Sequence, residues 1–222
     1  MNDNRSAHKA ADYEAEVRRT IPFHGELLKL AVEVALGVHP APTRWLDTGA
    51  GPGVLVEQAR ATCAGTEFWI ADPSDAMRAL AVARLGLPAE RVLACGSADL
   101  PDVGPFDVIT AVQCHHYGDM AAREQAVSRC RELLVPGGAL VVFENVRAES
   151  ERGQVLQRAR WASWQRSQGR DEATVKAHLA REGTQFFPIR VSQHLGLFAH
   201  LGFETVELVW RAYGQAGFLA IK

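Results

Sequence analysis

One loop of the chain combines an acid with three alternating glycines, in the order Asp47, Gly49, Gly51 and Gly53. Glycines at this spacing let the backbone approach a ligand more closely than any side chain would allow. The dinucleotide-binding pattern G-x-G-x-x-G would need its third glycine at position 54, where this chain has Val54. The loop therefore predicts a ligand site that departs from the dinucleotide fingerprint.

Two further acids follow later apolar runs. Asp72 lies about 20 residues beyond the glycine loop, a separation at which an acid can reach a ribose. It could instead cap the helix that follows, a role that Ser74 or Asp75 could also fill. Asp99 could bind a ligand or simply end a strand. Both alternatives stay open for each acid.

A histidine pair, His115 and His116, follows a fourth apolar run. A histidine at such a strand end can deprotonate a hydroxyl or thiol, or it can merely pack. Cys114 precedes the pair, but adjacent residues rarely converge on one metal ion and no spaced partner pair exists. The sequence therefore predicts no metal site. Asn145, after Glu144, could contact an acceptor or cap the next segment.

Apolar segments alternate with helical patterns through the middle of the chain. Strands are expected at Arg44–Asp47, Glu67–Ala71, Arg91–Cys95, Asp107–Val112 and Ala139–Glu144. Helices are expected near Gly53–Ala64, Ser74–Leu85 and Ala121–Leu134. This alternation predicts an α/β fold with a doubly wound parallel sheet. The carboxyl ends of its strands would gather the residues described above at one edge.

The two ends of the chain break this alternation. Ala10–Val38 is expected to be helical with an interruption near Ile21, and a final helix is expected over Ser192–Leu201. The last two strands, Glu204–Ala212 and Gly217–Lys222, have a short connection that requires antiparallel pairing. We expect one domain over residues 1–222, with a helical cap (10–38), a cofactor-binding core (39–146), a helical lid insert (147–190) and a final helix and hairpin (191–222).

Composition limits the classes of partner. The chain has 222 residues, 47% of them hydrophobic, and a formal net charge of −2, so no overall attraction to nucleic acid or an anionic membrane is expected. No apolar stretch approaches the roughly 20 residues of a membrane span. The four cysteines form no C-x-x-C pair. A cytoplasmic protein is therefore expected, and a homodimer is compatible with these properties.

The ordered set of motifs resembles class I S-adenosylmethionine-dependent methyltransferases over nearly the whole chain. In that family, glycines like those of the loop cradle the methionine part of the cofactor, an acid like Asp72 grips both ribose hydroxyls, and an acid like Asp99 accepts the adenine amino group. The resemblance implies S-adenosylmethionine as cofactor and a Rossmann-like seven-stranded, mostly parallel sheet in the order 3-2-1-4-5-7-6 with an antiparallel last strand. The cofactor-binding residues it implies are His24, Asp47, Gly49, Gly51, Gly53, Asp72, Pro73, Met77, Ser97, Ala98, Asp99, Ala111 and Gln113.

Within this family the chain is most similar to the branch of the carboxy-S-adenosylmethionine synthase of tRNA wobble-uridine modification. The segments that carry this similarity are Ile21–His24, Ser167–Arg170 and Trp210–Lys222. The chain departs from the synthase at His24, which aligns with a cofactor-touching tyrosine, and at Leu197, which aligns with the arginine that holds the extra carboxylate. Without that cation a buried carboxylate would be costly, so the synthase activity itself is not expected. Arg190 or Arg211 could substitute only in a different local geometry.

The expected reaction is methyl transfer to an N, O, S or activated C nucleophile of a small molecule, beneath a lid formed by the insert. His115, His116, His24 and Asn145 are the catalytic candidates. In the insert, four aromatic residues could line an apolar acceptor pocket or belong to the core: Trp161, Trp164, Phe186 and Phe187. Three alternatives remain: other chemistry at the sulfonium, such as cyclisation or another alkyl transfer; tRNA modification; and a cofactor-binding regulatory module.

Overall fold

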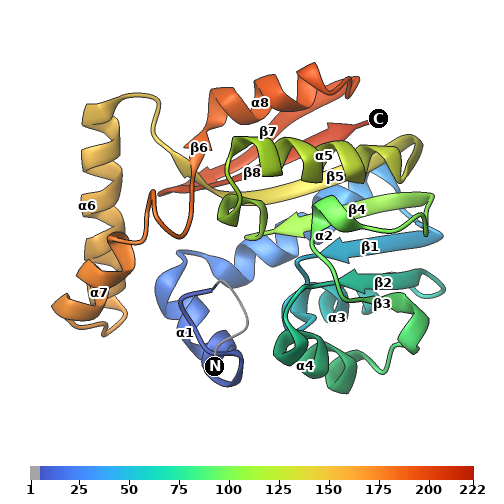
Figure 1. Cartoon of the computed structure of the whole chain (residues 1–222), viewed down its shortest axis with the longest axis horizontal. Coiled ribbons are helices and arrows are strands. Elements are labelled where there is room, and N and C mark those ends of the chain that lie inside the picture. Colours follow the sequence, from blue (N-terminus) through green and yellow to red (C-terminus); the bar gives the residue numbers. More distant parts are fainter. Residues whose placement is uncertain (1–5) are drawn as a thin grey trace.

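A mixed sheet forms the centre of the molecule (Figure 1). The structure is a computed structural model, and it describes residues 6–222. The strands follow the order β3-β2-β1-β4-β5-β8-β7, with the two-residue β6 paired to the end of β5. Apart from β6, this is the predicted order with its antiparallel hairpin at one edge. The strands are β1 (Arg44–Thr48), β2 (Glu67–Ala71), β3 (Val92–Leu93), β4 (Phe106–Val112), β5 (Leu134–Arg147), β6 (Ile189–Arg190), β7 (Thr205–Ala212) and β8 (Gln215–Ile221).

Helices cover both faces of this sheet because adjacent residues of its strands point to opposite sides. Trp45 packs into a core under α2, α3 and α4, whereas its neighbour Leu46 packs into a second core under α5 and α8. The helices are α1 (Tyr13–Thr20), α2 (His24–Val38), α3 (Val54–Arg60), α4 (Asp75–Leu85), α5 (Met120–Glu132), α6 (Glu151–Ser167), α7 (Glu172–Leu179) and α8 (Val191–His200). The continuous apolar runs of β4 and β5 follow from this two-sided cover.

Several predicted boundaries differ from the structure. The strand β5 extends beyond Ala139–Glu144 at both ends, since parallel β4 and antiparallel β8 flank it. The strand β3 shrinks to two residues at the sheet edge, where it pairs only with β2. The interruption expected near Ile21 is confirmed, because α1 ends at Thr20 and α2 begins at His24, after Phe23 with its left-handed backbone (φ 58°).

The hairpin strand β8 approaches β5 closely at one glycine. Its antiparallel register runs from Ala139 opposite Ile221 to Asn145 opposite Gln215. A Cβ at Gly217 would collide with the ring of Phe143. Glycine at this position therefore lets β8 lie flat against β5, and this register brings Gln215 beside Asn145.

The insert packs against the N-terminal helix α1. In Figure 1, α6 and α7 stand at the side of the sheet nearest α1. The indole Nε1 of Trp161 donates to the carbonyl oxygen of Thr20 at 2.7 Å, and the Arg19 guanidinium donates to the carbonyls of Gln168 at 3.0 Å and Gly169 at 2.9 Å. None of the helices in residues 6–222 has both the length and the apolar character that crossing a membrane requires.

Candidate functional site

Three left-handed glycines shape the loop after β1. Gly49, Gly51 and Gly53 have φ values of 65°, 53° and 80°, which disfavour other residues. A Cβ at Gly49 would collide with Cys114, and a Cβ at Gly53 would meet Leu85 at 2.8 Å. A Cβ at Gly51 would meet no atom within 4 Å. Gly51 thus opens onto space, whereas its neighbours allow close packing.

A cavity lies over this loop, which we call the glycine-loop cavity. It encloses about 530 Å³ of space that is partly open to solvent. The predicted residues that line it are His24, Asp47, Gly49, Gly51 and Gln113. The cavity therefore joins the end of β1, the end of β4 and the start of α2 at the predicted edge of the sheet.

Asp47 and His24 both line this cavity and have shifted pKa values. Burial raises the pKa of Asp47 to about 7, although a hydrogen bond from the Thr110 hydroxyl at 2.7 Å opposes the shift. Burial and the nearby Arg18 charge lower the pKa of His24 to about 4. At neutral pH the His24 imidazole is therefore uncharged, and Asp47 stands near the midpoint of its titration.

Asp72 supports the glycine loop by a hydrogen bond but does not itself line the glycine-loop cavity. Its Oδ2 accepts from the backbone N–H of Gly51 at 2.9 Å, and its Oδ1 accepts from the N–H of Ser74 at 2.9 Å. The hydroxyl of Ser74 caps α4 by accepting from the N–H of Met77 at 3.1 Å. Ser74 is therefore the helix cap, and the Asp72 carboxylate holds the loop to the start of α4. Pro73 lies between these two residues.

The remaining predicted cofactor residues lie apart from the glycine-loop cavity. Ser97 turns inward, where its hydroxyl bonds the Thr48 hydroxyl at 2.8 Å and Nε2 of His115 at 2.9 Å. Ala98 and Asp99 line a separate shallow depression beside α5. Ala111 is fully buried in β4. Roles for these residues, and for Met77 and Gly53, stay predictions from the family resemblance.

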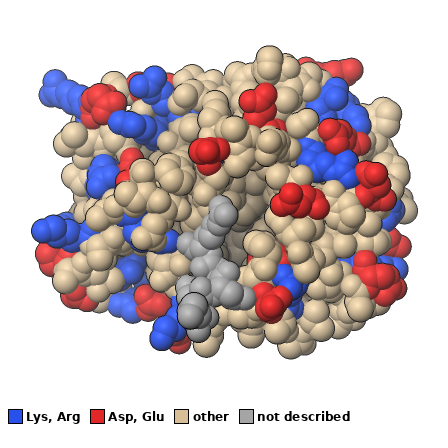
Figure 2. All heavy atoms as spheres, in the orientation of Figure 1, with Lys and Arg blue, Asp and Glu red and all other residues tan. Residues whose placement is uncertain are grey.

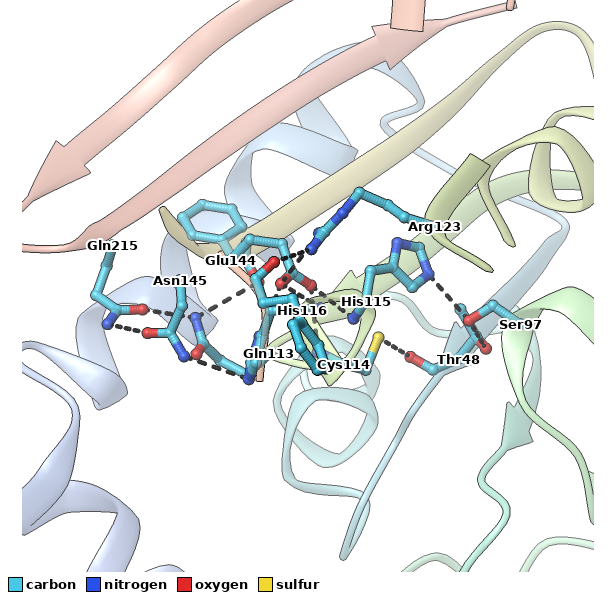
Figure 3. Close-up of polar contacts among 12 residues, drawn as sticks. Thr48, Ser97, Gln113, Cys114, His115, His116, Arg123, Glu144, Asn145 and Gln215 are labelled. Carbon is cyan, nitrogen blue, oxygen red and sulfur yellow. Dashed lines mark hydrogen bonds and ion pairs between the residues drawn. The ribbon is translucent and has the colours of Figure 1, made fainter. Parts of the chain in front are cut away.

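The turn after β4 is folded around one buried carboxylate, that of Glu144 (Figure 3). Its oxygens accept from the backbone N–H groups of Cys114 at 3.2 Å, His115 at 2.8 Å and His116 at 2.8 Å. Burial alone would raise the pKa of Glu144, but the charge and hydrogen bond of His116, with the Arg123 charge, lower it to about 2. Glu144 is thus an ionised anchor for the whole turn.

The two histidines of this turn point to different places. His115 contacts Ser97, burial lowers its pKa to about 4, and it lines neither cavity described here. The Nδ1 atom of His116 lies 2.7 Å from Oε2 of Glu144. Because an ionised carboxylate only accepts, Nδ1 is the donor of this hydrogen bond. Within residues 6–222, no three His, Cys, Asp or Glu side chains form a group suited to a metal ion.

A chain of amide hydrogen bonds leads from His116 to the glycine-loop cavity (Figure 3). The Nδ2 of Asn145 faces Nε2 of His116 at 3.2 Å, and Oδ1 of Asn145 accepts from Gln215 at 2.5 Å. The Oε1 of Gln215 accepts from Nε2 of Gln113 at 2.8 Å. The Oε1 of Gln113 is buried and has no hydrogen-bond partner among the described residues. In this series of hydrogen bonds, every donor lies on the side away from Glu144 and donates toward it.

A second cavity adjoins the first, and we call it the inner chamber. It contains about 400 Å³ of empty space and is lined by residues from α1, the turn after β4 and the insert. Tyr13, Val17 and Gln113 line both cavities. His116 and Asn145, two of the predicted catalytic residues, line the inner chamber, whereas His24 lines the other cavity.

Sequence reasoning missed several residues of the inner chamber. His8, Tyr13, His178 and Arg181 line it, and each comes from a helical or N-terminal segment without a recognisable motif. The anchoring role of Glu144 was also missed, and the one sequence feature that indicated it is the position of this acid at a strand end. Of the predicted aromatic lining, Trp161 and Phe186 are present, whereas Trp164 and Phe187 do not line this chamber.

Leu197 and the two arginines weighed beside it lie outside both cavities. Leu197 is buried in the core under α8, and Arg190 and Arg211 are exposed. None of the three lines either cavity in the described part of the chain. The residue that sequence reasoning aligned with the synthase's arginine is therefore an apolar core residue.

Comparison with protein families produced one match. Residues 46–140 match the model of the methyltransferase domain. This segment is less than half of the chain; it includes the glycine loop, Asp72 and the histidine turn, and it ends within β5. Comparison with curated proteins found no match.

Solved methyltransferase structures have the same architecture. An O-methyltransferase family protein from Burkholderia thailandensis has a TM-score of 0.71 and 17% identity, over 97% of this chain and 61% of that one. The 1,6-didemethyltoxoflavin-N1-methyltransferase of the same organism, solved with that compound and S-adenosylhomocysteine, has a TM-score of 0.59 and 17% identity, covering 96% and 84% of the two chains. The sugar N-methyltransferase KedS8 from Streptoalloteichus sp. ATCC 53650 has a TM-score of 0.64 and 15% identity, covering 96% and 92%. The chain therefore has the class I methyltransferase fold.

Proposed function

We propose that this chain is an S-adenosylmethionine-dependent methyltransferase that acts on a small molecule. The observation that carries the proposal is the pair of adjoining cavities, which share Tyr13, Val17 and Gln113. One cavity lies over the glycine loop and the other reaches the His116–Glu144 pair. Such a pair suits a reaction between two ligands held next to each other. The match to the methyltransferase domain and the shared fold support the same assignment.

The residues of the glycine-loop cavity fit this cofactor. Gly51 leaves space for a ligand against the backbone, and Oε1 of Gln113 is a buried acceptor with no described protein partner. Gly49, Gly51, Asp47 and Gln113 would hold the methionine part, and Asp72 would hold the ribose. When bound, the cofactor supplies a methyl carbon whose bond to a sulfonium sulfur breaks as the acceptor bond forms, which leaves S-adenosylhomocysteine.

His116 would act as the base for the acceptor. Glu144 holds Nδ1 as the donor, and in the neutral imidazole the lone pair of Nε2 faces Nδ2 of Asn145, whose place an acceptor hydroxyl would take. An imidazole fixed in this tautomer can take a proton from a hydroxyl as its oxygen becomes nucleophilic. This arrangement favours an oxygen acceptor over a nucleophile that needs no base.

The insert and α1 would exclude water from the reacting groups. Trp161 lines the chamber while its indole N–H bonds Thr20, and the N–H of Phe187 bonds the carbonyl of His116 at 2.7 Å. These contacts join α6 to α1 and the segment after α7 to the turn after β4, which is the role expected of a lid. A cytoplasmic location and a homodimer stay predictions from the sequence.

The resemblance to the synthase branch raises a second possible reaction, in which a group other than the methyl is transferred from the sulfonium. Products distinguish the two: methyl transfer yields S-adenosylhomocysteine, whereas attack on the aminobutyrate carbons yields methylthioadenosine. Leu197 lies in the core and Arg190 and Arg211 lie outside both cavities, so none of these three residues is placed to bind an extra carboxylate there. We therefore propose methyl transfer.

Calorimetric binding of S-adenosylhomocysteine tests the cofactor assignment. Gly51→Val adds a branched side chain to the cavity at φ 53° and should weaken binding at least a hundredfold. Gly65→Val is the matched control, because Gly65 also has positive φ and open surroundings but does not line the cavity. Asp72→Ala should also abolish binding. Unchanged affinity in the folded Gly51 and Asp72 variants would overturn the proposal.

A further inference from the structure

The glycine-loop cavity has a single arginine on its wall. Among its described lining residues, the Lys, Arg, Asp and Glu side chains are those of Glu14, Arg18 and Asp47. Glu14 already forms an ion pair with Arg84. The Arg18 side chain is exposed and has no hydrogen bond or ion pair with another described residue. A ligand in this cavity would therefore meet one guanidinium that can turn toward it.

The helix α1 is held beside the glycine loop by Arg84 of α4. The Arg84 guanidinium donates to the carbonyl oxygen of Pro52 in the loop at 2.7 Å. It also forms ion pairs with Glu14 of α1 and, at 3.4 Å, with Glu57 of α3. Because Glu14 and Arg18 are one helical turn apart, they lie on the same side of α1. The ion pair that fixes Glu14 therefore also keeps Arg18 at the cavity wall.

Groups of opposite charge enter this cavity from different elements. The Asp47 carboxyl group comes from β1, and the Arg18 guanidinium comes from α1; no ion pair joins the two. Burial, and after it the Arg18 charge, lowers the pKa of His24 to about 4, so Arg18 lies near a neutral imidazole and not near a second cation. A zwitterionic amino acid, with its ammonium and carboxylate on one carbon, complements this pair of charges.

We propose that Arg18 binds the α-carboxylate at the methionine end of the cofactor, while Asp47 faces the α-ammonium. A guanidinium suits this task because it can donate two parallel hydrogen bonds to one carboxylate. The cavity is partly open to solvent and Arg18 is exposed, so the carboxylate lies at the open side, where no enclosed space is needed. This inference rests on the proposed function, and it makes α1 part of the cofactor site.

Calorimetric binding of two matched ligands tests the role of Arg18 without any turnover. The first is S-adenosylhomocysteine, and the second is its decarboxylated analogue, which keeps the adenosine, the sulfur and the amine but lacks the carboxylate. The wild type should bind the first ligand about tenfold or more tighter than the second. Arg18→Gln should weaken S-adenosylhomocysteine by about ten- to thirtyfold and leave the analogue unchanged. Arg18→Lys keeps the charge without the forked geometry and should give an intermediate affinity for S-adenosylhomocysteine.

Lys29→Gln provides the matched control, because Lys29 is an exposed cation of α2 that does not line the cavity. It removes the same charge and should leave the affinity for both ligands unchanged. The inference fails if Arg18→Gln, shown to be folded by circular dichroism, weakens both ligands equally or weakens neither. In that case tight binding of S-adenosylhomocysteine by the wild type leaves the proposed function standing, whereas a wild type that binds neither ligand would overturn the cofactor assignment itself.

Discussion

At the scale of single residues, two buried carboxyl groups of this protein have opposite environments. Asp47 has one hydroxyl donor and no described cation beside it, so burial dominates and its pKa rises to about 7. Glu144 is also buried, yet three backbone N–H groups, His116 and Arg123 surround it, and its pKa falls to about 2. The first group can change its charge near neutral pH, and the second keeps its charge.

The Glu144 anchor should control the tautomer of His116. In Glu144→Gln, the amide oxygen can still accept backbone N–H groups, but an amide nitrogen facing Nδ1 cannot accept its proton. We expect the imidazole proton to move to Nε2, which would remove the base and lower kcat at least a hundredfold. Nitrogen NMR shifts of His116 report this tautomer without needing an acceptor. Glu182→Gln, which removes a lid carboxylate paired with Arg158, is the control. An unchanged tautomer in Glu144→Gln would contradict the assigned role.

Asp47 should make stability depend on pH in a defined direction. Its unfolded pKa is near 3.8 and its folded pKa is about 7, so between these values the unfolded chain releases the proton first. The free energy of unfolding should therefore fall as pH rises from about 4 to 7, and this contribution should be constant above. Asp47→Asn removes that loss, so its stability relative to the wild type should grow by about 2–3 kcal/mol between pH 5 and pH 8. Urea unfolding at both values measures the difference, and an equal difference at both would contradict the raised pKa.

At the scale of elements, one threonine connects the insert with the N-terminal helix. The Thr20 hydroxyl donates to the Glu16 carbonyl at 2.8 Å, and it contacts Nε2 of His8 at 3.0 Å and the Arg170 guanidinium at 2.5 Å. Its backbone carbonyl accepts the Trp161 indole. Four segments thus meet at the last residue of α1. The position of the chamber wall therefore depends on contacts with this one short helix.

Thr20→Val should loosen this junction while keeping the side-chain shape. The substitution leaves Arg170 and His8 without the shared oxygen in a buried setting, so we expect a loss of about 1–3 kcal/mol. Hydrogen exchange should increase in α6 and α7 but stay unchanged in β4 and β5. Thr62→Val is the control, because the Thr62 hydroxyl bonds only its local carbonyl and the neighbouring thiol. Equal protection of α6 and α7 in both variants would show that the junction does not hold the insert.

At the scale of the whole molecule, the surface charge is mixed. Figure 2 shows Lys and Arg side chains interspersed with Asp and Glu over the visible face. The 24 basic and 26 acidic residues nearly cancel. Strong binding to a polynucleotide needs many phosphate contacts that release counterions, and an evenly mixed surface provides few of them.

We therefore expect tRNA to bind only weakly, with little dependence on salt. Filter binding at 50 and 200 mM salt measures both the affinity and its slope. A loss of less than tenfold across this range is expected, whereas a protein with 6–10 phosphate contacts would lose about a thousandfold or more. A tight, steeply salt-dependent complex would contradict the small-molecule proposal and favour the tRNA alternative.

The strand order and the glycine loop could be predicted because their signals are local. Continuous apolar runs predict strands covered on both faces, and a short connection predicts the antiparallel hairpin. The alternating glycines Gly49, Gly51 and Gly53 predict a loop of close backbone approach, and the structure gives all three a positive φ. Strand lengths were predicted less well. Pairing with neighbours extends β5 and shortens β3, and pairing depends on the whole sheet.

The sequence by itself determined the α/β architecture and the position of the ligand-binding loop, since both depend on residues close together in the chain. Only the tertiary structure decided which histidine of the pair reaches a cavity. Glu144, 28 residues after His116, orients the His116 ring by accepting a hydrogen bond from its Nδ1. The His115 ring instead hydrogen-bonds Ser97 and lines neither cavity. Tertiary packing likewise brought Arg181 and His178 from the insert to a chamber shared with α1. Contacts between distant segments depend on packing geometry, which no local pattern of residues encodes.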